Sequence, residues 1–190
     1  MSTKTLTYTV LFLSLAAPGT AYLAPTVAAE QAVPSEKNPP GDIPDTQVFV
    51  DYNGAGFSMK VPEGWSRTDR ASGAVFADKY NTISVSVSAA PTAPTVATIT
   101  NGDAKSLAAS GRAVVVGSIK AIKLDGGQAI RVDYTANSEP NAVTNKQIRL
   151  EEVRFYLFGN GRVVTLDMSA PKGADNVDQW NLMANSLRVK

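Results

Sequence analysis

The sequence predicts an α+β domain in which an antiparallel β-sheet is flanked by helices. Three observations lead to this fold class. Short segments with apolar residues at alternate positions follow one another, and glycine-containing turns join several of them into hairpins. One helical segment interrupts the series, and an amphipathic one closes it. Hairpins between sequence neighbours favour an antiparallel sheet over a doubly wound parallel one.

The first predicted hairpin joins residues 48–53 to residues 57–61 through the turn Gly54-Ala55-Gly56. The sequence Pro62-Glu63-Gly64-Trp65 ends its second strand. We expect Trp65 to pack into the core, because a large aromatic side chain beside a turn usually does so.

A strict alternation marks residues 83–88, which read Ile-Ser-Val-Ser-Val-Ser. Successive side chains of a strand point to opposite faces, so the apolar residues should face the core and the serines water. The preceding strand is predicted over residues 74–78. Residues 101–110 are predicted to form a helix, with Asn101 as its N-terminal cap and Gly111 as its stop.

Two further hairpins are predicted in the second half of the chain. The first joins residues 114–124 to 128–136, and the second joins residues 148–158 to 162–168. In the strand over 148–158 the apolar residues change from even to odd numbers, and a β-bulge at Glu151-Glu152 would restore the inward face.

The last element is predicted from an apolar stripe at helical spacing, formed by Val177, Trp180, Ala184 and Leu187. We expect Trp180 to be a structural residue on the buried side of this helix. The sheet should then contain about six to eight strands, with one helix inserted midway and one at the C-terminus.

The first 29 residues are typical of an export signal. Lys4 gives a short positive start, residues 6–17 are mostly apolar, and Val27-Ala28-Ala29 supplies small residues for cleavage between Ala29 and Glu30. A signal for secretion and one for the thylakoid lumen have this same pattern.

Two alternatives to this processing remain open. Thr20-Ala21 offers a second cleavage site, and the segment could instead stay as a membrane anchor. Pro18 and Pro25 disfavour the anchor, because they interrupt the apolar stretch before it reaches the roughly 20 residues that a membrane span needs.

Residues 30–45 contain four prolines and few large apolar side chains. Such a segment buries too little surface to offset its ordering entropy, so we expect a flexible, extended, Pro-rich arm, which is either a spacer or a segment that orders on a partner. The folded domain is expected over residues 46–190.

The charges of the exported part balance. Lys4 is the only charged residue before Glu30, which leaves 17 acidic residues opposed by an equal number of basic ones. This balance opposes a general role in nucleic-acid binding, which needs clustered basic surface.

The composition also disfavours an enzyme, because the sequence contains neither Cys nor His. Their absence excludes catalytic triads that use either residue, thiolate chemistry and His-ligated zinc. A Ser-Lys dyad stays formally open, although no motif pairs a given Ser with a given Lys. Glu151 and Glu152 point to opposite faces of a regular strand, so they do not form an acid/base pair without a bulge.

Asp175, Asn176 and Asp178 resemble a fragment of a calcium loop. They lack the other ligands, the central Gly and the closing Glu of an EF-hand. Carboxylates at a helix start more often complement the helix dipole. We predict no bound cofactor, and whether a metal is bound stays open.

Three segments resemble the PsbP family of photosystem II extrinsic proteins. Residues 51–65 (DYNGAGFSMKVPEGW) are similar to the opening of that family, and residues 73–87 (GAVFADKYNTISVSV) to its Phe-x-Asp segment and alternating strand. Residues 161–189 are similar to its last strand, amphipathic helix and terminal strand. The resemblance covers about residues 47–189.

The resemblance implies an α/β/α sandwich that acts without catalysis in the thylakoid lumen, peripheral to the membrane and monomeric by itself. Its implied partners are lumenal subunits of photosystem II, where such proteins help to retain calcium and chloride at the oxygen-evolving cluster or assist assembly. The alternative is a secreted or periplasmic bacterial module of the same fold with an unknown ligand. The family's His-based zinc sites have no counterpart, since this chain has no His.

With a neutral overall charge, steering toward such a partner must come from local basic residues. The candidates are Lys120, Lys123, Arg149 and Arg154. We expect their contribution to weaken with salt.

Overall fold

The computed structural model describes residues 30–190, which form ten strands and three helices. The predicted export signal, up to Ala29, lies outside these residues. Their elements, in chain order, are β1 (Phe49–Gly54), β2 (Phe57–Pro62), β3 (Ser66–Arg70), β4 (Gly73–Ala77), β5 (Thr82–Ala89), α1 (Val96–Asn101), α2 (Asp103–Ala109), β6 (Val115–Leu124), β7 (Gly127–Asn137), β8 (Arg149–Gly159), β9 (Arg162–Pro171), α3 (Val177–Ser186) and β10 (Arg188–Val189).

Seven strands form the central sheet, in the order β3-β4-β5-β9-β8-β7-β6, and every neighbouring pair is antiparallel. A smaller sheet has the order β1-β2-β10. The predicted hairpins are confirmed, since β1 pairs with β2, β6 with β7 and β8 with β9.

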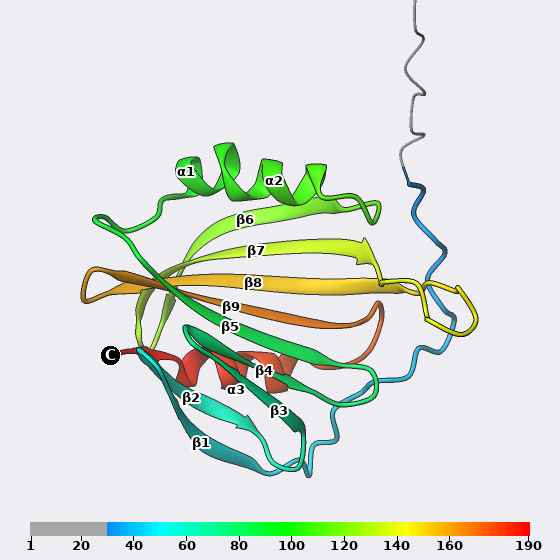
Figure 1. Cartoon of the computed structure of the whole chain (residues 1–190), viewed down its shortest axis with the longest axis horizontal. Helices are drawn as coiled ribbons and strands as arrows, with labels where there is room; N and C mark the ends of the chain where they lie inside the picture. The colour runs from blue at the N-terminus through cyan, green and yellow to red at the C-terminus, as the bar shows by residue number, and fades with distance from the viewer. Residues whose placement is uncertain (1–29) are drawn as a thin grey trace, which may run out of the picture.

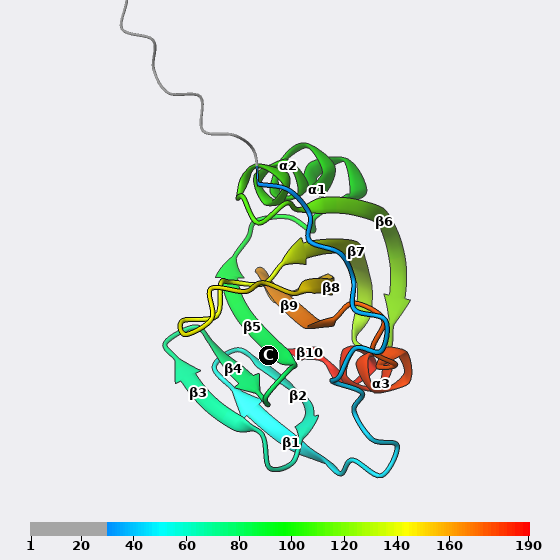
Figure 2. The same cartoon turned by 90° about the vertical axis from the view of Figure 1, so that its right-hand side faces the viewer.

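The central sheet is covered on both faces (Figures 1 and 2). Helix α3 and the small sheet cover one face, where the larger core cluster includes Phe57, Leu166 and Met183. Helices α1 and α2 cover the other face over a smaller cluster that includes Ile99 and Val132. The α+β class with an antiparallel sheet between helices is therefore confirmed.

Three sequence-based details were wrong. The bulge expected at Glu151-Glu152 is absent, because β8 keeps a continuous register with both neighbours. Strand β3 was missed, since all five of its residues are exposed and it has no apolar alternation. Asn101 does not cap a helix but ends α1, which begins after Thr95 with a capping box closed by Thr98.

The segment over residues 30–45 is extended, as its composition predicts, but it is packed along the domain rather than free of it. The carboxylate of Glu30 accepts from the Arg112 backbone N–H (2.7 Å) and from Asn137 Nδ2 (2.9 Å). Further along, Ile43 is buried and its N–H donates to Asn176 Oδ1 (2.6 Å). These contacts tie both ends of the arm to the domain.

Candidate binding cavity

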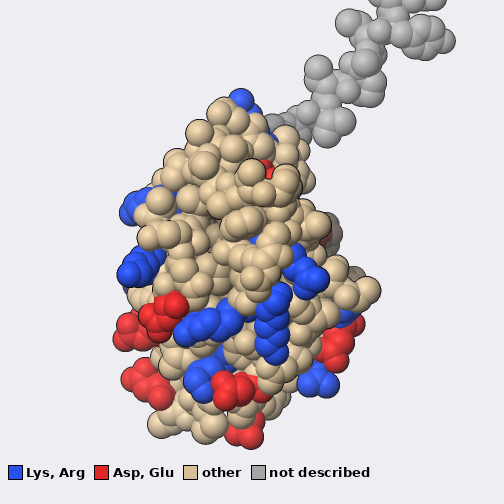
Figure 3. Space-filling view, turned by 90° about the vertical axis from the view of Figure 1, so that its left-hand side faces the viewer, with Lys and Arg blue, Asp and Glu red and all other residues tan. Residues whose placement is uncertain are grey.

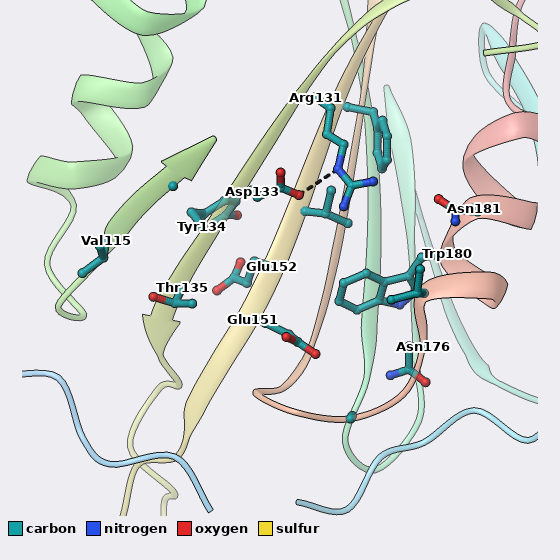
Figure 4. A pocket seen from close by; sticks show the side chains of 15 residues that line it. Val115, Arg131, Asp133, Tyr134, Thr135, Glu151, Glu152, Asn176, Trp180 and Asn181 are labelled. Atoms are coloured by element: carbon teal, nitrogen blue, oxygen red, sulfur yellow. Dashed lines mark hydrogen bonds and ion pairs between the residues drawn. The ribbon is translucent and has the colours of Figure 1, made fainter. Parts of the chain in front are cut away.

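A cavity of about 340 Å³ lies between the central sheet and α3 (Figure 4). Strands β6, β7 and β8 form one wall, and α3 with the loop before it forms the other. The lining residues are Val115, Gly117, Arg131, Asp133, Tyr134, Thr135, Glu151, Glu152, Val153, Phe155, Ala174, Asn176, Val177, Trp180 and Asn181. This volume is at the lower end of the range of roughly 300–1,000 Å³ seen for small-molecule pockets.

Apolar side chains form much of the cavity surface. Trp180 projects from α3 and is only 9% exposed, while Val153 and Phe155 lie on β8 and are buried. Val115 and Val177 are 57% and 60% exposed, so they bring apolar surface to the edge of the cavity. The cavity can therefore receive an apolar group.

One pair of charges in the cavity is already matched. Arg131 Nε lies 2.7 Å from Asp133 Oδ1, and the guanidinium of Arg131 lies over the Phe155 ring, 5.6 Å from its centroid. Ser118 also donates to Asp133 through its hydroxyl. The charges of Arg131 and Asp133 therefore balance in the upper part of the wall drawn in Figure 4.

Glu151 is a charged lining residue without an ion-pair partner among residues 30–190, whereas Glu152 Oε1 lies 3.6 Å from Arg112 Nη2. Burial raises the pKa of Glu151 above its usual value, which outweighs the opposing effects of the Gly173 backbone N–H and of Lys172. The site thus contains a partly desolvated carboxylate.

Glu152 lies on the opposite side of β8, so the two adjacent glutamates do not share a site (Figure 4). Burial raises the pKa of Glu152 as well, and Arg112 Nη2 lies 3.6 Å from its Oε1. On the same face Arg154 Nε pairs with Asp167 Oδ1 (2.6 Å), which also accepts from the Tyr134 hydroxyl (3.2 Å). This polar cluster lies on the face beneath α1 and α2, and its members Tyr134 and Glu152 also belong to the cavity lining.

The structure does not bring the four predicted docking residues together. Lys120 and Lys123 are exposed, but they are three residues apart on β6 and face opposite sides of the sheet. Arg154 is half-buried in its pair with Asp167.

Arg149 requires a correction, because it is 6% exposed and does not offer its charge to a partner. Its guanidinium donates to the Ala113 carbonyl, to Asn137 Oδ1 and to Thr135 Oγ1. The sequence pattern missed this role, since a basic residue at a strand start is usually exposed.

The fragment that resembles a calcium loop has a different role. Asn176 is buried, and its side chain binds Ile43, Gly41 and Asn81. Within residues 30–190 no three His, Cys, Asp or Glu side chains lie together as a metal site would require. No helix of that part of the chain has the length and hydropathy of a membrane span.

The fold is similar to that of solved bacterial proteins. The solution structure of cyanobacterial PsbP from Synechocystis matches with a TM-score of 0.55 and 18% identity, over 79% of this chain and 98% of that one. The chain has a PsbP-like fold. No family model matches the sequence, and the comparison with curated proteins finds no relative.

Two further solved structures are similar to this chain. A crystal structure from Bacteroides thetaiotaomicron matches with a TM-score of 0.50 and 13% identity, over 75% of this chain but only 48% of that one. LpqN, involved in cell envelope biogenesis of Mycobacterium tuberculosis, matches with a TM-score of 0.47 and 17% identity, over 76% and 91% of the two chains.

Proposed function

We propose that this chain is an exported, non-catalytic binding module with a PsbP-like fold. The geometry supports binding rather than catalysis, because Glu151 and Glu152 face opposite sides of the sheet and the Arg131–Asp133 pair is already satisfied. A sequence without His or Cys offers few other groups that could act as a base or a nucleophile at neutral pH.

The partner that we propose is the lumenal face of photosystem II. The observation that carries this proposal is the match to cyanobacterial PsbP, which extends over 98% of that protein's chain. The module is then peripheral to the thylakoid membrane. It supports oxygen evolution by helping to retain calcium and chloride or by assisting assembly.

The end of the molecule that bears the C-terminus is the docking surface that we favour. Basic side chains lie across the middle of this end, with acidic side chains around them (Figure 3). Lys190 binds Asn53 and donates its backbone N–H to Gly56, and Arg162 lies close to the same glycine. Arg188 lies beside Asp125, in the turn that follows Lys123 and Leu124. Exposed charges at one end steer association with an acidic surface, and salt weakens that steering.

The test is rebinding of the protein to photosystem II washed with salt, prepared from the same organism. We expect the protein to rebind at low salt and to restore oxygen evolution when calcium and chloride are limiting. Arg162→Glu should weaken rebinding, whereas Lys105→Glu, an equal change of charge on exposed α2, should not. Failure to rebind or to co-purify would refute the proposed partner.

Deletion of residues 30–45 is a less direct test than these charge changes. It removes the arm, for which the sequence leaves a docking role open, but it also removes the buried Ile43 and the Ile43 N–H and Gly41 carbonyl that Asn176 binds. A loss of binding in that variant therefore has to be compared with its loss of stability.

A second candidate is a secreted or periplasmic module that binds a ligand unrelated to photosynthesis. The cavity beneath α3 favours it, because apolar walls with one unmatched carboxylate suit a small molecule. Ligand binding by the isolated protein, together with no affinity for photosystem II, would support this alternative.

A further inference from the structure

The cavity between the sheet and α3 combines an aromatic wall with a carboxylate on the opposite wall. Trp180 reaches in from α3, and Glu151 reaches in from β8 (Figure 4). The two residues are 29 positions apart in sequence. The packing of α3 on the sheet brings both to the lining of the same cavity. An indole face and a carboxylate are the two groups that attract an organic cation most strongly.

The charges around the cavity leave one negative charge unmatched. Arg131 is paired with Asp133 at 2.7 Å and Glu152 with Arg112 at 3.6 Å, so neither pair contributes net charge. Lys172 is exposed, and its ammonium lies outside ion-pair distance of Glu151. A cation that enters the cavity therefore meets Glu151 without first displacing an ion-pair partner.

Binding a cation would also compensate the partial desolvation of Glu151. A partly buried carboxylate is stabilised by a cation that has also left water, provided that the cation makes close contacts with the protein. Trp180 can supply those contacts through its ring face, since it is largely buried but exposed to the cavity.

We propose that this cavity binds a small organic ammonium ion, with its charged group between Glu151 and the Trp180 ring and its apolar part against Val153 and Val177. The volume of about 340 Å³ accommodates a small molecule rather than a folded peptide segment. The apolar rim residues Val115 and Val177 fit the alkyl substituents of such an ion. The inference depends on the cavity alone and holds whichever macromolecular partner the protein has.

The test is a titration of the isolated protein with choline, followed by NMR of the two indole N–H signals. We expect the Trp180 signal to shift to saturation. Trp65 provides an internal control, because it lies in a separate hollow beside Val61 and Arg67 and its signal should stay in place. The uncharged carbon isostere of choline, 3,3-dimethylbutan-1-ol, should bind at least tenfold more weakly.

Glu151→Gln should raise the dissociation constant for choline at least tenfold, because it removes the charge and keeps the shape. The matched control is Glu63→Gln, which removes an exposed carboxylate in the turn after β2 and should leave binding unchanged. Circular dichroism of both variants checks that they fold.

Two results would overturn the inference. One is equal binding of choline and its neutral isostere, which would make the cavity a purely apolar site. The other is a Trp180 signal that choline does not shift, in a protein whose spectrum shows it to be folded. Neither result bears on rebinding to photosystem II, which is measured separately.

Discussion

Replacing Asn176 with Ala tests how the arm over residues 30–45 is held. Asn176 Oδ1 accepts from the Ile43 N–H at 2.6 Å, and its Nδ2 donates to the Gly41 carbonyl (3.0 Å) and to Asn81 Oδ1 (3.1 Å). Asn81 also donates to the same Gly41 carbonyl at 3.0 Å. The amide of Asn176 therefore lies at the centre of a network that joins the arm, the start of β5 and the start of α3.

The expected cost follows from the groups that lose their partners. In the Asn176→Ala variant the Ile43 N–H and Asn81 Oδ1 are left without a partner, whereas the Gly41 carbonyl keeps Asn81. Each buried group left unsatisfied costs about 1–3 kcal/mol, and some relaxation is expected, so the total should be about 3 kcal/mol. For a domain of this size that corresponds to a fall in Tm of about 6–12 °C.

The assay combines thermal unfolding with hydrogen exchange of the arm. If the loss of stability is confined to residues 41–45, the Ile43 amide should exchange roughly a hundredfold faster. A loss of about 3 kcal/mol in local stability corresponds to a rate change of about that size. Asn181→Ala is the matched control, because Asn181 is an exposed residue of the same helix. Unchanged exchange at Ile43 in Asn176→Ala, or an equal fall in Tm in both variants, would refute the reasoning.

Three further predictions concern the tryptophans, Glu151 and the mature N-terminus. Trp180→Ala should destabilise the domain by about 3–5 kcal/mol and the half-buried Trp65→Ala by less; wild-type stability in denaturant unfolding would contradict both. Burial raises the pKa of Glu151, so folding disfavours its charged form. The resulting loss of stability is present above the pKa of Glu151 in the folded state, and it fades as the pH falls toward the pKa in the unfolded state. Glu151→Gln should therefore raise Tm at pH 7 and not at pH 4, and a constant difference would argue against it. Mass spectrometry of the native protein should find Glu30 as the first residue, whereas an intact Met1 in a membrane fraction would rule out the cleavage.

The hairpins were predictable because their signals are local. A two-residue turn with Gly between alternating segments specifies its own pairing, as at Asp125-Gly126 between β6 and β7. Strand β3 has no such signal, since its residues Ser66–Arg70 are all exposed and pair only with β4 at the sheet edge. Its place in the sheet depends on β4, which no local pattern in β3 reveals.

The arm has contacts that its composition does not reveal. Its four prolines and polar residues predict an extended, mobile chain, and the chain is extended. A single buried side chain, Ile43, together with the buried amides of Asn137 and Asn176, is enough to hold it against the domain. Proline also lowers the entropy that the unfolded arm loses on docking, so the composition that suggests mobility also reduces the cost of order.

The cavity could not be predicted from the sequence because its aromatic residue, Trp180, and its carboxylate, Glu151, come together only through tertiary packing. Trp180 was expected to be structural, and it does belong to the larger core cluster, but part of its ring also lines the cavity. Glu151 was interpreted as half of a bulge. The position of α3 over β6, β7 and β8 brings Trp180 and Glu151 into the same cavity, and the packing of the whole core determines that position.

The change of phase along β8 has a cause that also explains the site. A strand with one buried face shows a single alternation, but β8 is an interior strand of a sheet that is covered on both sides. Val153 and Phe155 face the larger core beneath α3, while Tyr156 faces the smaller core beneath α1 and α2. Apolar residues on both faces break the alternation without any bulge, and the unbroken register directs Glu151 to the cavity and Glu152 to Arg112. A bulge at this point would have turned the two carboxylates toward one site, so the continuous register is what leaves the cavity with a single unmatched charge.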